Sequence, residues 1–261
     1  MRVTNPSGIV WVLYNSGHSN KGILYPIGNC IVYDVKRKCC LTASHVLKKD
    51  AIFESKFLES DDCKHLEIRP TFICFMVGLQ CSSSKPLRFE VLNTVEILPE
   101  ITALYLNHLS HGDNIPFPKE QAFIPDTKPV NILWPIIICG YPSSIQRFNC
   151  YPDNEFMELL YKGTPIYDYN ISGIVAAYYH DSAPYFIDSD LLPVFVVDNG
   201  VLPGMSGCAV LRNTPMNNKI VGMVVKNIAI NSSPEVEDYF IKKEKNKLVH
   251  SLCLCVADIT I

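Results

Sequence analysis

Two short segments of the sequence contain residue types that together can perform nucleophilic catalysis. An apolar run at residues 40–47 contains Thr-Ala-Ser-His and includes His45, and a Gly-Met-Ser-Gly turn at residues 204–207 places Ser206 before a second apolar run. A serine hydroxyl is a weak nucleophile until a base removes its proton, and a neutral histidine can do so near pH 7. The two segments therefore predict His45 as a general base and Ser206 as a nucleophile.

The glycines of the serine turn add a second element of the same chemistry. Gly204 and Gly207 permit a tight turn that projects Ser206. In such a turn the backbone N–H groups of Gly204 and Ser206 can converge on the point where the oxyanion of a tetrahedral intermediate forms. Each segment alone is a weak signal. His45 lies in one group of predicted strands and Ser206 in another, which would place the base and the nucleophile where two barrels face each other.

The rest of the sequence consists mainly of strand signals. Short runs rich in Ile, Val, Tyr and Phe are separated by Gly, Pro, Asn and Asp, which favours barrels or sandwiches over alternating strands and helices. A Ser-Ser-Pro sequence at residue 232, followed by two glutamates, predicts a helix that runs to about residue 247. The predicted strands are 9–14, 30–33, 38–42, 71–77, 87–97, 101–106, 132–139, 171–178, 194–197, 208–211 and 219–230.

A proline-rich stretch at residues 110–130 separates the strands into two groups. We therefore expect an N-terminal barrel at 1–112 with His45, a linker at 113–130 and a C-terminal barrel at 131–231 with Ser206. A C-terminal helix and tail would occupy 232–261. Residues 142–170 have few strand signals and predict a long loop.

Composition excludes several classes of protein. The chain has 261 residues, of which 48% are hydrophobic and 19% charged, so it can form a packed core. A net charge of −3 gives no basic field for nucleic acid, and no apolar run reaches the ~18 residues of a membrane span. The N-terminus lacks the apolar stretch of a signal peptide.

The eleven cysteines lie mostly inside apolar runs. They form no pair of Cys-x-x-Cys knuckles, so we expect no structural metal site, and a cysteine-rich metal or redox protein has little support. A chain of this length does not need disulfides to fold, which favours reduced thiols and an intracellular location.

Four segments together resemble the trypsin/chymotrypsin-like serine proteases, and most closely their HtrA-type branch. The resemblance implies an all-β fold of two six-stranded antiparallel β-barrels, here with the C-terminal helix, hydrolysis of peptide bonds in a polypeptide substrate through an acyl-enzyme, and no cofactor. We expect no PDZ domain between residue 230 and residue 261, because that stretch is too short for one. The segments are 198–207, similar to Asp-x-x-x-x-Pro-Gly-x-Ser-Gly, 171–176, similar to Ser-Gly-Ile-Val-Ser, 220–223, similar to Ile-Gly-Ile, and 137–142, similar to a strand and Gly-x-Pro turn.

The family outline also bears on assembly and location. HtrA-type relatives are often homo-oligomers, and this sequence neither favours nor opposes one. Organellar processing proteases, including peroxisomal ones, share the outline, so we expect a cytoplasmic or organellar protein, with peroxisome and mitochondrion both open and secretion disfavoured.

The third catalytic position departs from the family pattern. The family has an aspartate in Asp-Ile-Ala-Leu-x-x-Leu, and the matching stretch at 100–106 begins with Glu100. The resemblance therefore assigns Glu100 as the carboxylate that orients His45, although its extra methylene requires a shifted backbone or another rotamer. Cys208 is a second departure. Together they keep open a catalytically impaired binding or scaffold protein with the protease fold.

The resemblance also locates the pocket for the residue that precedes the cleaved bond. It lies between the segment leading to the serine and the strand that follows, with Gly200 at its base and Val224 and Val225 on its wall. Gly200 stands where trypsin-like enzymes have aspartate, so a preference for Arg or Lys is not supported. The two valines indicate a small or apolar pocket, while Lys226 leaves an acidic preference open.

Overall fold

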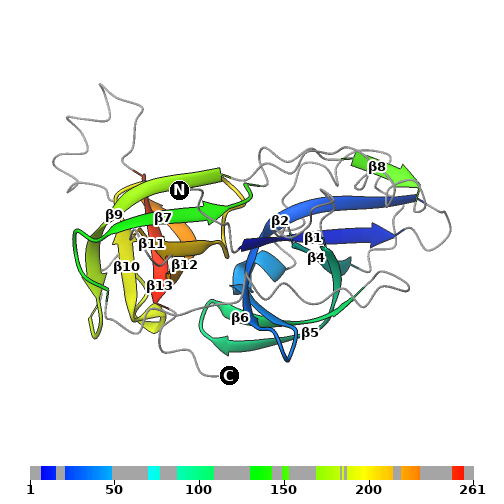
Figure 1. Ribbon diagram of the computed structural model, residues 1–261, viewed down its shortest axis with the longest axis horizontal. Helices are drawn as coiled ribbons and strands as arrows, with labels where there is room; N and C mark the ends of the chain where they lie inside the picture. The colour runs from blue at the N-terminus through cyan, green and yellow to red at the C-terminus, as the bar shows by residue number, and fades with distance from the viewer. Residues whose placement is uncertain are drawn as a thin grey trace.

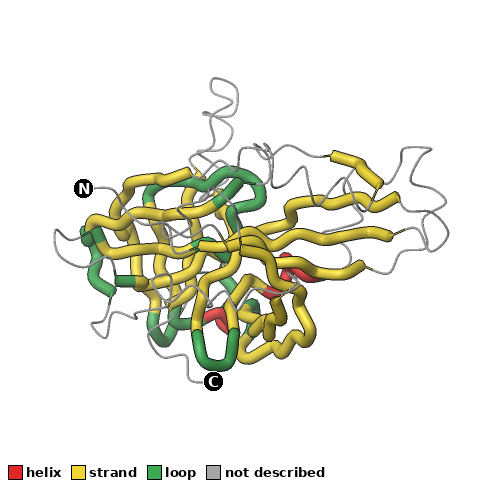
Figure 2. Tube along the Cα trace, turned by 45° about the vertical axis from the view of Figure 1, so that its right-hand side comes forward, coloured by secondary structure: helices red, strands yellow, loops and turns green. Residues whose placement is uncertain are grey.

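The computed structural model describes residues 7–15, 21–48, 70–76, 87–108, 130–142, 149–152, 169–182, 184, 187–213, 219–229 and 249–255. Strands dominate these residues, and helix is limited there to two short 3₁₀ turns, η1 (Ser44–Leu47) and η4 (Ser189–Leu191) (Figure 2). The helix expected at 232–247 and most of the expected linker lie outside these ranges.

The N-terminal half forms the first sheet, on the right of Figure 1. Its strands run in the order β1-β4-β5-β6-β3-β2-β8, and β1 also pairs with β2, so six of them form a closed ring with β8 added outside it. The strands are β1 (Ser7–Asn15), β2 (Lys21–Asp34), β3 (Cys39–Ala43), β4 (Pro70–Met76), β5 (Leu87–Leu98), β6 (Ile101–His108) and β8 (Asn149–Pro152).

The C-terminal half forms a closed barrel of six antiparallel strands in the order β10-β13-β12-β11-β7-β9 (Figure 1). The strands are β7 (Pro135–Gly140), β9 (Tyr169–Tyr179), β10 (Val194–Val197), β11 (Ala209–Arg212), β12 (Ile220–Ala229) and β13 (Val249–Cys255). The all-β double-barrel fold expected from the sequence is thereby confirmed.

Two strands differ from the sequence expectation. Residues 249–255, expected in the tail, form β13 and complete the second barrel between β10 and β12. Residues 149–152, inside the expected loop, form β8 and pair with β2 of the first sheet.

The two barrels share an apolar core at their interface. Ile31, Leu41 and Ile101 of the first barrel belong to the same buried cluster as Met223 and Leu252 of the second. Each barrel also has a cluster of its own. The two halves therefore pack as one body.

A side-chain hydrogen-bond bridge ties β1 to the second barrel at this interface. The hydroxyl of Ser7 donates to the carbonyl of Cys139 on β7 at 2.7 Å and accepts the N–H of Ala209 on β11 at 3.0 Å. Ser7 is fully buried, so the first strand of the chain is fixed against two strands of the other barrel.

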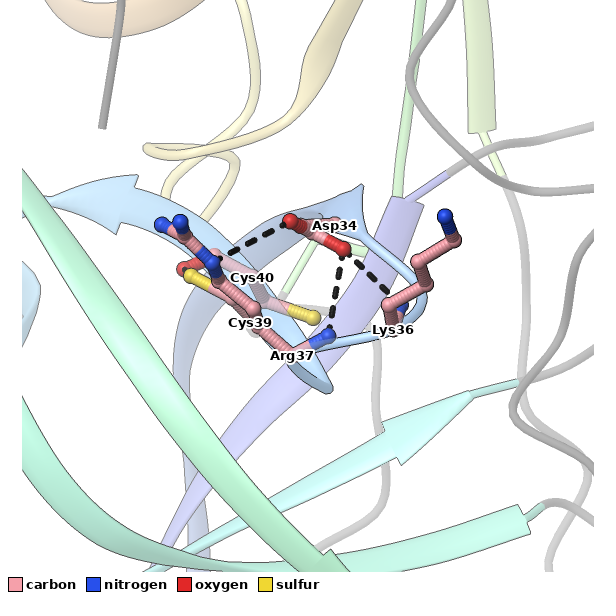
Figure 3. Close-up of polar contacts among 5 residues, drawn as sticks. All are labelled: Asp34, Lys36, Arg37, Cys39 and Cys40. Carbon is pink, nitrogen blue, oxygen red and sulfur yellow. Dashed lines mark hydrogen bonds and ion pairs between the residues drawn. The ribbon is translucent and has the colours of Figure 1, made fainter.

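The turn between β2 and β3 is held by Asp34 (Figure 3). Its Oδ1 accepts the backbone N–H groups of Lys36 at 2.8 Å and Arg37 at 3.1 Å, and its Oδ2 lies 3.7 Å from the Arg37 guanidinium. Aspartate favours such turns because its short carboxylate can bond to the backbone two or three residues ahead. This turn starts β3, whose five residues are all buried.

In the described part of the chain, no helix is long and apolar enough to cross a membrane.

Candidate active site

His45 lies at the end of a fully buried strand. β3 runs between β2 and β6 and ends at Ala43, and the η1 turn that follows carries His45. The Ser44 hydroxyl, beside His45, is buried and bonds to Thr102 Oγ1 on β6 at 2.8 Å. The imidazole thus extends from the end of a buried strand and remains part-exposed.

The register of β3 and β6 brings Glu100 to His45. Ala43 pairs with Ile101, so the residue before Ile101 lies beside the residues after Ala43. The Glu100 carbonyl accepts the Ser44 N–H at 3.0 Å, and its Oε2 lies 3.0 Å from His45 Nδ1. With side-chain exposed fractions of 33% for His45 and 27% for Glu100, the pair is partly shielded from water.

Glu100 has an unusual backbone conformation. Leu98 pairs with Ile101, so Pro99 and Glu100 form the whole connection between β5 and β6. Glu100 has φ of 63°, in the left-handed region that favours glycine. Proline followed by a residue with positive φ is the pattern of a type II turn, in which the second position is usually glycine.

The Ser206 loop follows β10 and leads into β11. Gly204 has φ of 82° and Gly207 φ of 85°, which other residues rarely adopt. Space also requires glycine at 207, because a Cβ there would lie 2.0 Å from the carbonyl oxygen of Asn29. The sequence-based expectation of a glycine-dependent turn at Ser206 agrees with these dihedral angles.

Backbone N–H groups alternate in their partners along this loop. Those of Met205 and Gly207 donate to the carbonyls of Leu202 at 3.2 Å and Val224 at 2.8 Å. Those of Gly204 and Ser206 have no hydrogen-bond partner among the described residues. These are the two donors that the sequence suggested for an oxyanion.

Asn29 on β2 holds the serine loop against the first barrel, a role that the sequence analysis missed. Its Nδ2 donates to the carbonyls of Gly204 at 2.7 Å and Tyr141 at 3.1 Å, and its Oδ1 accepts the Tyr141 N–H at 2.7 Å. Its own N–H donates to the Ser206 carbonyl at 2.8 Å. The Thr42 hydroxyl, on the strand leading to His45, donates to the Asn29 carbonyl at 2.6 Å. No sequence pattern indicated this buried hub, since its partners are far away in the chain.

Gly28 separates the histidine segment from the serine segment. A Cβ at Gly28 would lie 2.7 Å from both methyl groups of Val46, the residue after His45, and 3.1 Å from the Ser206 carbonyl oxygen. One glycine backbone therefore lies between the two segments. Among the contacts of the described residues, no hydrogen bond joins the Ser206 hydroxyl to His45. Bonds of this kind are often loose in a site without substrate.

The expected pocket residues have different surroundings. Val224 is fully buried in the core of the second barrel, and Val225, 1% exposed, belongs to the cluster shared by the barrels. Gly200 is part-exposed and precedes Val201, whose backbone bonds to the Asn227 side chain. Lys226 and Asn227, farther along β12, are exposed. Lys226 and Asn227, and not the two valines, are therefore the first exposed residues along β12.

Cys208 is an apolar core residue. It is fully buried, and burial raises the pKa of its thiol well above the usual value, with Cys253 and Cys139 nearby adding to the effect. A Cys208 thiolate is therefore disfavoured, and a cysteine nucleophile at this position has no support. No group of three or more His, Cys, Asp or Glu suited to a metal ion occurs among the residues that the structure describes.

Comparison with solved structures identifies the fold. No family model matches the chain. No curated protein matches it either. The chain is similar to the HtrA-type protease AlgW with decapeptide, at 11% identity over 98% of this chain and 62% of AlgW, with a TM-score of 0.53. It is also similar to Rv3671c protease in an inactive form, at 12% identity over 96% of this chain and 84% of that one, with a TM-score of 0.47. A serine-to-alanine mutant of Rv3671c from M. tuberculosis H37Rv, also an inactive form, matches at 12% identity over 97% and 82%, with a TM-score of 0.47. The chain thus has a trypsin-like, HtrA-like protease fold and spans 62% of the length of AlgW.

Proposed function

We propose that this chain is a serine endopeptidase in which Ser206 attacks the peptide carbonyl and His45 is the general base. The observation that carries the proposal is the 3.0 Å contact between His45 Nδ1 and Glu100 Oε2. In the proposed mechanism, Glu100 Oε2 accepts the hydrogen bond of Nδ1–H, so the lone pair is on Nε2, the nitrogen that can take the serine proton.

The proposed reaction uses groups of this chain alone. The Ser206 oxygen adds to the carbonyl carbon of a polypeptide substrate while His45 takes the hydroxyl proton. The N–H groups of Gly204 and Ser206 then stabilise the oxyanion. His45 returns the proton to the leaving amine. Water then attacks the acyl carbon while His45 takes its proton, and His45 passes that proton to the Ser206 oxygen as the acid product leaves.

The backbone N–H groups of Gly204 and Ser206 support this reaction. Neither has a hydrogen-bond partner among the described residues, so both are available to an oxyanion. The free, buried thiols of Cys39, Cys208 and Cys253 are consistent with the proposed reducing, intracellular location.

A fluorophosphonate probe tests the proposal, because it reacts covalently with an activated serine. We expect the probe to label the wild-type chain at Ser206, as located by peptide mapping. The Ser206→Ala variant should not be labelled, and the labelling rate of His45→Ala should be lower than that of the wild type by at least about 10²-fold. Ser172→Ala, at an exposed serine on β9, is the matched control and should be labelled at the wild-type rate.

Absence of labelling in folded wild-type protein would contradict the proposal. It would favour the alternative, a protease-fold binding or scaffold protein. The unbonded Ser206 hydroxyl is the observation that favours this alternative.

A further inference from the structure

The segment that leads to Ser206 is fastened to β12 and β13 by side chains. Asn227 Oδ1 accepts the Val201 N–H at 2.9 Å, and Asn227 Nδ2 donates to the Val201 carbonyl at 2.7 Å. The Ser251 hydroxyl donates to the Asn199 carbonyl at 2.7 Å. The oxygen and the nitrogen of the Asn227 amide are thus both hydrogen-bonded to the backbone of Val201.

An irregularity in β12 accounts for the position of Asn227. The pairing of β12 with β13 shifts between Val224 and Lys226, so that Asn227 pairs with Ser251. A bulge of this kind breaks the in–out alternation of a strand and redirects the side chains that follow it. Val224 and Val225 are buried, whereas Lys226 and Asn227 are both exposed.

We propose that Asn227 limits the depth of the pocket for the residue preceding the cleaved bond, and that this residue is Gly, Ala or Ser. This inference rests on the proposed protease function. The pocket expected from the resemblance lies between the segment leading to Ser206 and β12, and the Asn227 amide spans these two walls. Val201 is 8% exposed and Val224 is fully buried, and both belong to the buried cluster of the second barrel, so the amide lies over packed apolar residues.

The energetic cost of a larger substrate side chain follows from these bonds. To enter between the walls, the side chain must displace the Asn227 amide from Val201. Displacement leaves an N–H and a carbonyl of a largely buried residue without partners, which is unfavourable. A methyl or hydroxymethyl group is short enough to remain above the amide.

The test uses two peptide diphenyl phosphonates that differ only in the residue next to phosphorus, alanine or phenylalanine. In each, the Ser206 oxygen bonds to phosphorus, phenol leaves, and the adduct is measured by intact mass. We expect the wild type to react at least about tenfold faster with the alanine probe, and Asn227→Gly to reduce this ratio at least about tenfold by reacting faster with the phenylalanine probe. Asn227→Ala is a second variant for use if the glycine destabilises the strand.

Asn199→Ala controls for a general loosening of the loop. Its amide donates to the Ser172 carbonyl on β9 at 2.7 Å, away from β12, so the ratio should stay at the wild-type value. Equal wild-type rates with both probes, an unchanged ratio in both Asn227 variants, or the same change in Asn199→Ala would each overturn the assignment.

A small fluorophosphonate without a peptide separates the two levels of failure. If it does not label the wild type, the proposed function and the pocket assignment fail together. If it labels all variants while the probe ratio does not change, only the role of Asn227 fails.

Discussion

Glu100 combines an unfavourable backbone conformation with a contact to the candidate base. A non-glycine residue with φ of 63° is destabilised by on the order of 1 kcal/mol, and glycine would remove this strain. Backbone strain often occurs at functional sites, and here the carboxylate of the strained residue lies 3.0 Å from His45.

Replacement of Glu100 should therefore separate stability from activity. We expect Glu100→Gly to raise the free energy of unfolding by up to about 1 kcal/mol, because glycine adopts the positive φ without strain. The same change should slow fluorophosphonate labelling of Ser206 by about 10²-fold or more, since His45 loses the group that fixes its tautomer. Urea unfolding and labelling rates measure the two effects.

Lys38→Gly is the matched control for this experiment. Lys38 has φ of 50° in the turn before β3 and no part in the proposed reaction, so glycine there should stabilise the protein without slowing labelling. Wild-type labelling by Glu100→Gly would show that the carboxylate does not orient His45.

At the scale of the elements, the sequence located most of the described strands to within three residues at each end. β10 coincides with its expected range, β3 and β5 differ from theirs by one residue, and β7 differs by up to three. β2 begins at Lys21, well before the expected residue 30, because Pro26, Gly22 and Gly28 obscure the strand signal there. β13 was missed because the apolar stretch is short and its pairing with β10 and β12 is a tertiary effect.

The candidate site was predictable only in part for the same reason. His45 and Ser206 have local sequence signatures, and Glu100 has a family position. Asn29 lies 175 residues from Gly204 in the sequence, and Asn227 lies 26 residues from Val201, so only the folded chain reveals what they hold. Such tertiary partners leave no pattern in a single sequence.

The role of β2 as a support for the serine loop can be tested at Asn29. Asn29→Ala removes three hydrogen bonds, two of them buried and one part-buried, which the side chain makes to the Gly204 carbonyl and to the N–H and carbonyl of Tyr141. We expect a loss of about 2–4 kcal/mol in the free energy of unfolding. The loop that carries Ser206 should also loosen, and labelling should slow.

Asn29→Asp and Asn93→Ala refine this experiment. Aspartate keeps the acceptor for the Tyr141 N–H but turns an oxygen toward two carbonyls, so Asn29→Asp should be at least as damaging as alanine. Asn93, exposed on β5, should tolerate alanine. Wild-type stability and labelling in Asn29→Ala would contradict the supporting role.

At the scale of the whole molecule, the shared cluster predicts that the two barrels unfold together. The chain has two tryptophans, Trp11 on β1 and Trp134 just before β7, so each reports on one barrel. In Trp134→Phe and in Trp11→Phe, the fluorescence of the remaining tryptophan should follow the same urea transition as the far-UV circular dichroism. We expect the barrels to unfold together because unfolding of one would expose the apolar interface residues of the other to water.

Leu41→Ala examines the origin of this coupling. Leu41 is fully buried in the shared cluster, and its truncation should lower the free energy of unfolding by about 2–5 kcal/mol. Separate transitions for Trp11 and Trp134 in otherwise wild-type protein would mean that the interface does not couple the barrels.

The position of β13 in the chain has a consequence for biosynthesis. The strand between β10 and β12 is made after every other described strand, so the barrel that carries Ser206 cannot close until residue 255 has left the ribosome. A partly synthesised chain therefore contains the His45 segment before the barrel around Ser206 can close. The order of translation itself would delay the proposed activity of Ser206 until the nascent polypeptide can close its second barrel.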